Sequence, residues 1–229
     1  MPKSISIVIP ARNEEDTVAA VVSRVRDFAE VAEIVVVNNA SDDRTAERAE
    51  AAGARVVDCR RPGLGEALKT GFAAAKRDLV LKLDADLGQF DPGLVPKLVA
   101  AFTEGTGMVK GSWFDPTDDL PMTRLLIRPL IRQIFPEIDH IQSPNSGIYL
   151  IDRRLVELSY MPSNNSADLD VMLQVSLRNR AIREVEIGKI SHDPRDRDHY
   201  NAMAENILEL FLRYHSATVT RREVGVSCP

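Results

Sequence analysis

Two aspartates one residue apart, Asp84 and Asp86, close an apolar run that begins at Leu79. Nearly continuous apolar residues over 79–83 are typical of a parallel strand that is buried on both faces. Open α/β sheets bind ligands at the carboxyl ends of such strands, and carboxylate oxygens suit Mg²⁺ or Mn²⁺. The alternative is an ordinary turn, because aspartate also favours turns. The pair therefore predicts either a metal-assisted phosphate site or a simple loop.

Similar apolar runs precede this strand and alternate with amphipathic stretches. We predict strands at 5–9, 34–37, 55–57 and 79–83. Helices are predicted after Asn13, after Ser41 or Asp42 with an end at Gly53, and over 65–75. This alternation is typical of an α/β fold with a doubly wound, mostly parallel central sheet and helices on both faces.

The second half is less regular. Asp91-Pro92 resembles a helix start, and further helices are predicted at about 123–135, 168–177 and 201–220. Strands are predicted at 108–110, 147–151 and 182–187. No linker or repeat separates the halves, so residues 1–229 are predicted to form one domain. Residues 1–90 would be its nucleotide-binding half, and residues 91–229 its acceptor-side half.

Composition excludes several classes of protein. A chain of 229 residues with 44% hydrophobic residues can bury one sizeable core. A net charge of −5 argues against a nucleic-acid-binding protein, which usually carries a basic face. Two cysteines are too few for a disulfide framework, and no apolar run approaches the length of a membrane span. We expect a soluble, cytoplasmic protein.

Polar loops follow all four strands of the first half. Because parallel strands end at one edge of the sheet, these loops should meet there. They are Pro10–Glu15, Asn38–Asp43, Arg61–Ala67 and Asp84–Asp86.

In this order, the loops resemble those of nucleotide-sugar glycosyltransferases of the GT-A fold. The resemblance is closest to glucosyl-3-phosphoglycerate synthases and more distant to mannosylglycerate synthases. It extends over about residues 5–214 through Val109-Lys110-Gly111, Arg128-Pro129-Leu130, Ser146-Gly147, Asp170 and His192. It implies transfer of a hexosyl group from a nucleoside diphosphate sugar, with UDP favoured, to a hydroxyl of a small anionic or natural-product acceptor. Retention of the anomeric configuration and a Mg²⁺ or Mn²⁺ cofactor are implied as well.

The resemblance also implies a donor and metal site. The metal ligands would be Asp86 and His192. Asn38 stands at a position that is acidic in many relatives, so an amide would contact the base. The full set implied to bind the nucleotide sugar is Pro10, Ala11, Asn13, Glu14, Asn38, Gly63, Gly65, Asp84, Ala85 and Gly147.

Two acidic residues compete for a place near the acceptor hydroxyl. Asp168 and Asp170 are two residues apart and should point to different sides of a helix. Alternatively, Asp168 could be a helix N-terminal charge that interacts favourably with the helix dipole. We choose Asp170 as the catalytic residue, together with Asp84, and keep Asp168 as the second choice.

The acceptor side departs from the pattern of these relatives. Leu64 replaces a lysine of the glycine-rich loop, so Arg60, Arg61 or Lys69 would have to supply the positive charge. The Gly-Leu-Gly form resembles polyprenyl-phosphate mannosyltransferases. A helix face with arginines at i, i+4 and i+8 predicts an anionic-acceptor site or, equally, solvated charge. The residues assigned to the acceptor are Lys110, Arg124 and Arg128, with Arg132 on the same face.

Three alternatives stay open on sequence grounds. One is an inverting transferase that acts on a polyprenyl phosphate, with Asp170 as general base. Another is a sugar-phosphate nucleotidyltransferase, although Pro10-Ala-Arg-Asn stands where such an enzyme has a glycine-rich loop. The third is a non-catalytic nucleotide-sugar-binding protein. The oligomeric state is also open, a homodimer included.

Overall fold

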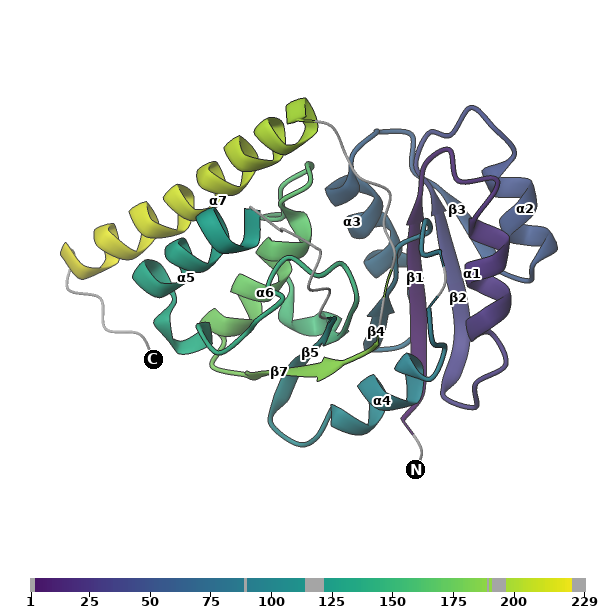
Figure 1. Ribbon diagram of the computed structural model, residues 1–229, viewed down its shortest axis with the longest axis horizontal. Coiled ribbons are helices and arrows are strands. Elements are labelled where there is room, and N and C mark those ends of the chain that lie inside the picture. The colour runs from purple at the N-terminus through teal and green to yellow at the C-terminus, as the bar shows by residue number, and fades with distance from the viewer. Residues whose placement is uncertain (1–2, 89, 114–121, 189, 191–196, 224–229) are drawn as a thin grey trace.

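The four apolar runs of the first half form the parallel part of the sheet. The computed structural model describes residues 3–88, 90–113, 122–188, 190 and 197–223. Strand β1 lies between β2 and β4, and β3 follows β2, all in parallel register (Figure 1). The strands are β1 (Ile5–Ala11), β2 (Val31–Asn38), β3 (Arg55–Asp58) and β4 (Leu79–Lys82).

The second half adds three strands in an order that the chain does not follow. β6 (Tyr149–Asp152) inserts between β4 and β5 (Thr106–Ser112) and runs antiparallel to both. β7 (Ala181–Glu186) lies parallel to β5 at the edge. Within the described residues the sheet has seven strands in the order β3-β2-β1-β4-β6-β5-β7. The predicted mostly parallel α/β sheet is confirmed.

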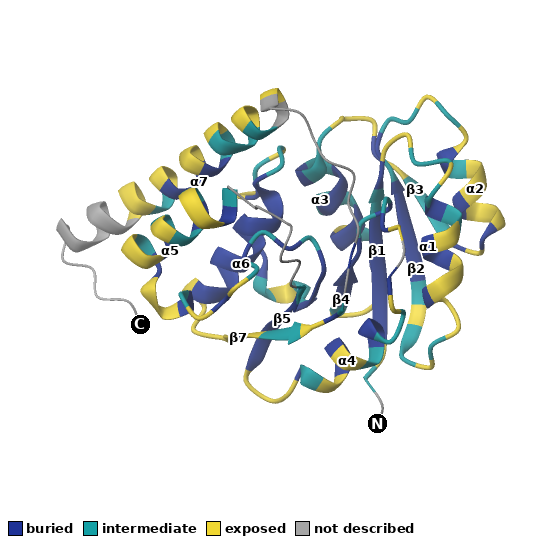
Figure 2. Ribbon diagram, in the orientation of Figure 1, coloured by how far each residue is buried: buried dark blue, intermediate teal, exposed yellow. Residues whose placement is uncertain are grey.

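Helices cover both faces of this sheet, because its strands are apolar on both sides (Figure 2). Val8 faces the core that includes α3, α5, α6 and α7, whereas its neighbours Ile7 and Ile9 face the core that includes α1 and α4. The helices are α1 (Val18–Val25), α2 (Thr45–Ala51), α3 (Leu64–Ala74), α4 (Leu94–Ala101), α5 (Arg128–Ile134), α6 (Ala167–Leu177) and α7 (Arg197–Glu223). In the described part of the chain, none of them is long and apolar enough to cross a membrane.

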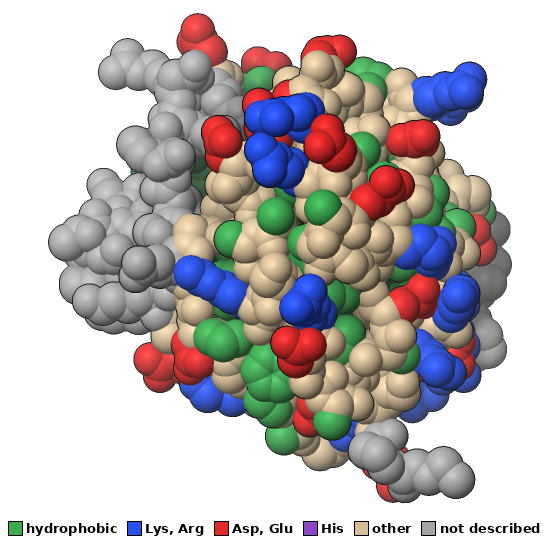
Figure 3. Space-filling model, turned by 90° about the vertical axis from the view of Figure 1, so that its right-hand side faces the viewer, with side chains coloured by type: hydrophobic (Ala, Val, Ile, Leu, Met, Phe, Trp, Pro, Cys, Tyr) green, Lys and Arg blue, Asp and Glu red, His purple; other side chains and the backbone are tan. Residues whose placement is uncertain are grey.

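Short helical turns complete the fold. A π-helical turn (Thr123–Ile127) leads into α5, and 3₁₀ turns occupy Pro136–Ile138 and Arg153–Leu155. On the described part of the face that carries α1 and α2, acidic and basic side chains are interspersed and form no basic patch (Figure 3).

Several helix starts differ from prediction. Asn13 does not cap α1, because its φ of 57° places it in the left-handed region and the helix begins only at Val18. α2 likewise begins at Thr45, after Ser41 and Asp42. Its predicted end is confirmed, since Gly53 has a φ of 97°.

Candidate active site

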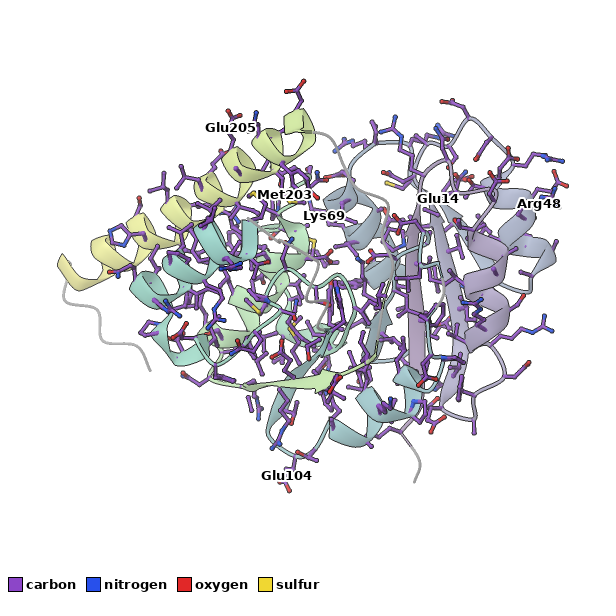
Figure 4. All side chains as sticks on the ribbon, in the orientation of Figure 1. Glu14, Arg48, Lys69, Glu104, Met203 and Glu205 are labelled. Atoms are coloured by element: carbon purple, nitrogen blue, oxygen red, sulfur yellow. The ribbon has the colours of Figure 1, made fainter. Side chains whose placement is uncertain are left out.

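The loops after β1 and β2 are joined by hydrogen bonds at the carboxyl edge of the sheet. The backbone N–H of Asn13 donates to Ser41 Oγ at 3.1 Å, and Asn13 Oδ1 accepts from the Asp42 N–H at 2.9 Å. The Glu14 N–H donates to Thr45 Oγ1 at 2.8 Å. Figure 4 shows Glu14 at the end of the sheet where β1 finishes, opposite the end that carries Glu104. Pro10 is half-buried at this edge, and the Ala11 methyl packs into the core.

A buried amide links the second loop to the glycine-rich loop. Asn39 Nδ2 donates to the Arg61 carbonyl at 2.7 Å, and its Oδ1 accepts from the Gly63 N–H at 2.8 Å. Its neighbour Asn38 donates from Nδ2 to Asp58 Oδ1 at 3.0 Å. Sequence reasoning chose Asn38 and missed Asn39. An asparagine one residue past the strand end, beside a glycine-rich loop, was the available signal.

The two glycines of the third loop allow the segment before α6 to approach closely. A Cβ on Gly63 would clash with the Ser163 carbonyl, and one on Gly65 with the Pro162 carbonyl. The Gly65 N–H donates to the Ser163 carbonyl at 3.1 Å. Between the glycines, Leu64 packs against the core and places no charge at the edge. The nearby cation of Lys69 pairs with Glu66 Oε1 at 2.8 Å and lies on α3 (Figure 4).

A cluster of buried charges lies at the end of β4. The fully buried Lys82 donates from Nζ to Asp84 Oδ1, and to Asp168 Oδ2 at 3.1 Å. Asp168 Oδ1 accepts from the hydroxyl of Tyr149 at 2.8 Å. A Cβ on Gly147 would lie 2.5 Å from Asp84 Oδ2 and 2.7 Å from Lys82 Nζ. Glycine is therefore required here, because backbone packs directly on the ion pair.

The surroundings fix the protonation states of this cluster. Burial by itself would lower the pKa of Lys82, but the carboxylates of Asp168 and Asp84 outweigh it and raise that pKa well above the ordinary lysine value. Burial, reinforced by Asp168, raises the pKa of Tyr149 well above that of an ordinary tyrosine. Lys82 is therefore an ammonium ion and Tyr149 a neutral donor at physiological pH. The cluster comprises two carboxylates, of which Asp84 is more exposed (30% against 11% of the side chain).

Lys110 does not reach the surface as an acceptor-binding residue would. It is fully buried, donates from Nζ to the Ser146 carbonyl at 2.9 Å and lies 5.2 Å from the centroid of the Tyr149 ring. Burial lowers the pKa of Lys110 to about 8. The prediction that Lys110 binds the acceptor is therefore corrected: its side chain is buried against the sheet.

These features belong to a known family. The family model described as "Glycosyl transferase family 2" matches residues 6–157, which include every loop described above and Gly147. The chain is a family 2 glycosyltransferase. The resemblance found in the loop motifs is thus confirmed.

Relatives of this family 2 glycosyltransferase cover most of its length. Glucosyl-3-phosphoglycerate synthase of Mycobacterium tuberculosis is 32% identical over 92% of this chain and 73% of the relative. The synthase of Mycolicibacterium smegmatis is 31% identical over 92% and 77%. Dolichol-phosphate mannosyltransferase of Pyrococcus furiosus is 27% identical over 80% and 55%.

Solved structures agree. The crystal structure of the Mycobacterium tuberculosis synthase in complex with Mn²⁺, UDP-glucose and phosphoglyceric acid has a TM-score of 0.84 at 32% identity, and covers 93% of this chain and 79% of that one. The complex of that synthase with Mg²⁺ and UDP has a TM-score of 0.83, also at 32% identity and with the same coverage. The GT-A fold and the glycosyltransferase activity are therefore established.

The structure does not bring Asp170 to this glycosyltransferase site. Asp170 is fully buried and accepts from Gln174 Nε2 at 2.7 Å, Arg213 at 2.8 Å and the Tyr214 hydroxyl at 2.8 Å. Burial raises its pKa, although these partners oppose the rise. Two residues along a helix correspond to about 200°, so Asp168 faces β4 while Asp170 faces α7. The choice between the two aspartates is corrected: Asp168 is the one beside Asp84.

The predicted arginine face is also divided. Arg128 donates to Gln142 Oε1 at 2.7 Å and lies 3.9 Å from Asp139, and Arg132 Nε lies 3.1 Å from Asp139. Arg124 is exposed and belongs to the π-helical turn, whose wider spacing breaks the i, i+4, i+8 alignment with α5. Arg128 and Arg132 are therefore held by the segment after α5.

The predicted metal ligands are only partly described. Asp86 lies half-buried in the loop after β4, one residue from the buried Ala85, whereas His192 lies outside the described residues. Within the described residues no three histidine, cysteine or acidic side chains gather as a metal site. The oxygen donors of the Asp84–Asp86 loop fit a hard divalent cation.

Proposed function

We propose that this enzyme transfers glucose from UDP-glucose to the hydroxyl of a small phosphorylated acid such as phosphoglycerate. The observation that carries the proposal is the carboxylate of Asp84, which Lys82 and the Gly147 backbone fix at the carboxyl edge of the sheet. The named activity of the synthases at 31–32% identity supports this donor and acceptor, as do the UDP-glucose and phosphoglyceric acid bound in a crystal of the Mycobacterium tuberculosis synthase. Their acceptor is small and anionic, as the sequence suggested.

The first three loops would bind the nucleotide. The pairing of Asn13 with Asp42 and of Asn39 with Gly63 holds these loops in one rigid surface before the donor arrives. We assign Pro10, Ala11, Asn13, Glu14 and Asn38 to base and ribose. Gly63 and Gly65, whose N–H groups donate to Asn39 and Ser163, would let the third loop pack closely on the diphosphate side of the donor.

Asp86 and His192 would hold a divalent cation. When bound, the ion would neutralise the negative charge that grows on the leaving diphosphate. Mn²⁺ and Mg²⁺ in the crystals of the synthase support this assignment.

Asp84 and Gly147 would lie against the donor sugar. Breaking the glycosidic bond leaves positive charge on the anomeric carbon, so a fixed carboxylate nearby stabilises the transition state. Asp168, behind Asp84 and only 11% exposed, would act on Asp84 through Lys82. Retention, with the acceptor hydroxyl attacking from the leaving-group side, is part of this proposal. The exposed Arg60 and Arg61 are candidates for the positive charge near the diphosphate, and the exposed Arg124 is the candidate for binding the acceptor phosphate.

The test is turnover of UDP-glucose with 3-phosphoglycerate, followed by UDP release and detection of the glucosylated product. We expect turnover with Mn²⁺ or Mg²⁺ and its loss in excess chelator. Asp86→Ala should lower kcat by about 100-fold or more while leaving the melting temperature in place. Asp27→Ala, at a side chain that is 85% exposed, is the matched control and should behave as wild type. Full activity in chelator, or in Asp86→Ala, would refute the metal role.

A further inference from the structure

Lys82 is an unusual residue for its place in the sheet. It is the last residue of β4, in an otherwise apolar run, and its side chain is fully buried. A buried ammonium ion is strongly disfavoured unless carboxylates compensate it. Lys82 has two such partners: Asp84, two residues along the chain just beyond β4, and the distant Asp168, in the first turn of α6.

The sheet itself sets the position of Lys82. Lys82 lies directly opposite Tyr149 of β6, and Tyr149 lies directly opposite Lys110 of β5. Residues opposite one another on neighbouring strands point to the same face, so the three side chains form one fully buried row. The hydroxyl of Tyr149 reaches Asp168, which Lys82 also contacts. The Lys82 ammonium therefore contacts Asp84 after β4 and Asp168 of α6, and Tyr149 of β6 holds Asp168 in turn.

Asp84 is the member of this network that reaches the edge of the sheet. Its side chain is 30% exposed, whereas that of Lys82 is 0% exposed and that of Asp168 is 11% exposed. Lys82 and the Gly147 backbone both pack against the Asp84 carboxyl group. A donor sugar at this edge would meet Asp84 on its open side and could not touch Lys82. The influence of Lys82 on the reaction must therefore pass through Asp84.

We propose that Lys82 is a positioning residue of the transfer reaction, whose buried ammonium bridges Asp84 and Asp168 and fixes the Asp84 carboxylate beneath the donor sugar. This inference rests on the proposed function, because it takes Asp84 to face the sugar. Without Lys82, two carboxylates would face each other with no cation between them, and Asp84 would move. Lys82 binds neither the nucleotide nor the cation in this arrangement.

The experiment compares Lys82→Met with the double variant Lys82→Met/Asp168→Asn and with wild type. Methionine keeps the length and lacks the charge. The double variant also removes the opposing carboxylate, so it restores folding where the single variant is unstable. Lys97→Met, at a lysine whose side chain is 48% exposed, is the control and should leave all readouts unchanged.

Four quantities are measured for each protein. The rates are transfer to 3-phosphoglycerate and hydrolysis of UDP-glucose without acceptor; the others are the donor KM with Mn²⁺ and the melting temperature. We expect roughly a 100-fold loss of kcat for both rates in the single and the double variant, with donor KM within about threefold. The melting temperature should fall in the single variant and recover in the double variant.

Recovery of wild-type kcat in the double variant would overturn the proposal, because the loss would then come from charge repulsion or misfolding. Wild-type kcat in a folded Lys82→Met would overturn it directly. Failure of the proposed function has a different signature: wild type would transfer nothing to phosphoglycerate. Hydrolysis of UDP-glucose would still report on Lys82 in that case.

Discussion

Asp168 and Asp170 lie two residues apart on α6, and their surroundings are chemically alike. Each is buried, accepts a 2.8 Å hydrogen bond from a tyrosine hydroxyl and contacts a cation. The difference is where the partners belong. Lys82 also holds Asp84 at the edge of the sheet, whereas Gln174, Arg213 and Tyr214 belong to α6 and α7. The same residue type therefore serves a site on one face of the helix and an anchor on the other.

Burial and hydrogen bonding alone therefore do not identify a functional carboxylate. What separates the two aspartates is whether a partner also holds a residue at the carboxyl edge of the sheet. Asp168 is connected through Lys82 to the partly exposed Asp84. Asp170 fastens α7, and its cation partner Arg213 has a half-exposed side chain at the protein surface away from β4.

Of the two aspartates, Asp168 should have the larger effect on catalysis. Asp168→Asn should lower kcat for transfer by about 100-fold, because the Lys82 ammonium loses one of its two anchors and Asp84 its position. Metal-dependent UDP binding, measured by calorimetry, should stay within about threefold of wild type. A variant with wild-type kcat would show that Asp168, like Asp170, is only structural.

Asp170 should show the opposite pattern. Asp170→Asn turns one carboxylate oxygen into an NH₂ that meets the donors of Gln174, Arg213 or Tyr214. Gln174 cannot simply flip, because its Oε1 accepts from the Glu157 N–H at 2.7 Å. We expect a loss of about 3 kcal/mol in the free energy of unfolding, measured in urea, as for other broken buried charge networks. The kcat of the folded variant should stay within about threefold, and a large loss of kcat at full stability would reverse our assignment.

Lys110, in the buried row with Lys82 and Tyr149, predicts a pH dependence of the stability of the protein. The pKa of Lys110 is about 8 in the folded protein and 10.5 in the unfolded chain, so the unfolded state binds more protons between these values. Stability should therefore rise with pH in this window, by at most about 3 kcal/mol from this residue. The free energy of unfolding of wild type, minus that of Lys110→Met, should therefore rise from pH 8 to pH 10.

Lys82→Met gives the matched control for this measurement. The pKa of Lys82 is raised in the folded state, so its contribution is fully present below about pH 10.5 and is lost only above it. The corresponding difference for Lys82→Met should therefore change less from pH 8 to pH 10 than that for Lys110→Met, and only because the Lys82 charge adds to burial in lowering the Lys110 pKa. Equal slopes for the two lysines would contradict the environments described for them.

Much of the first half could be predicted from the sequence because its signals are local. The apolar runs of β1 to β4 lie where expected, and Gly53 ends α2 as predicted. Helix starts were less predictable, since Asn13 adopts a left-handed conformation in a loop that is held by Ser41 and Asp42. That conformation depends on residues from another loop.

The arrangement of the site was harder to predict, because it depends on contacts between distant parts of the chain. The apolar character of β6 does not reveal that it inserts between β4 and β5. α6 is buried on all sides over residues 167–176, so no polar face indicates which aspartate points to the sheet. One signal was available and unused: Lys82 and Lys110 interrupt strands that are otherwise apolar, and such cations require buried acceptors. The His192 assignment stays a prediction.

The placement of β6 has a consequence for synthesis on the ribosome. The first four loops are complete by about residue 90, but β4 gains its second neighbour only when residues 149–152 have emerged. Until then the β4 backbone is unpaired on one side, and the Lys82 ammonium lacks Asp168. We therefore expect a nascent or truncated chain that stops before β6 to fold poorly and to expose an aggregation-prone strand edge.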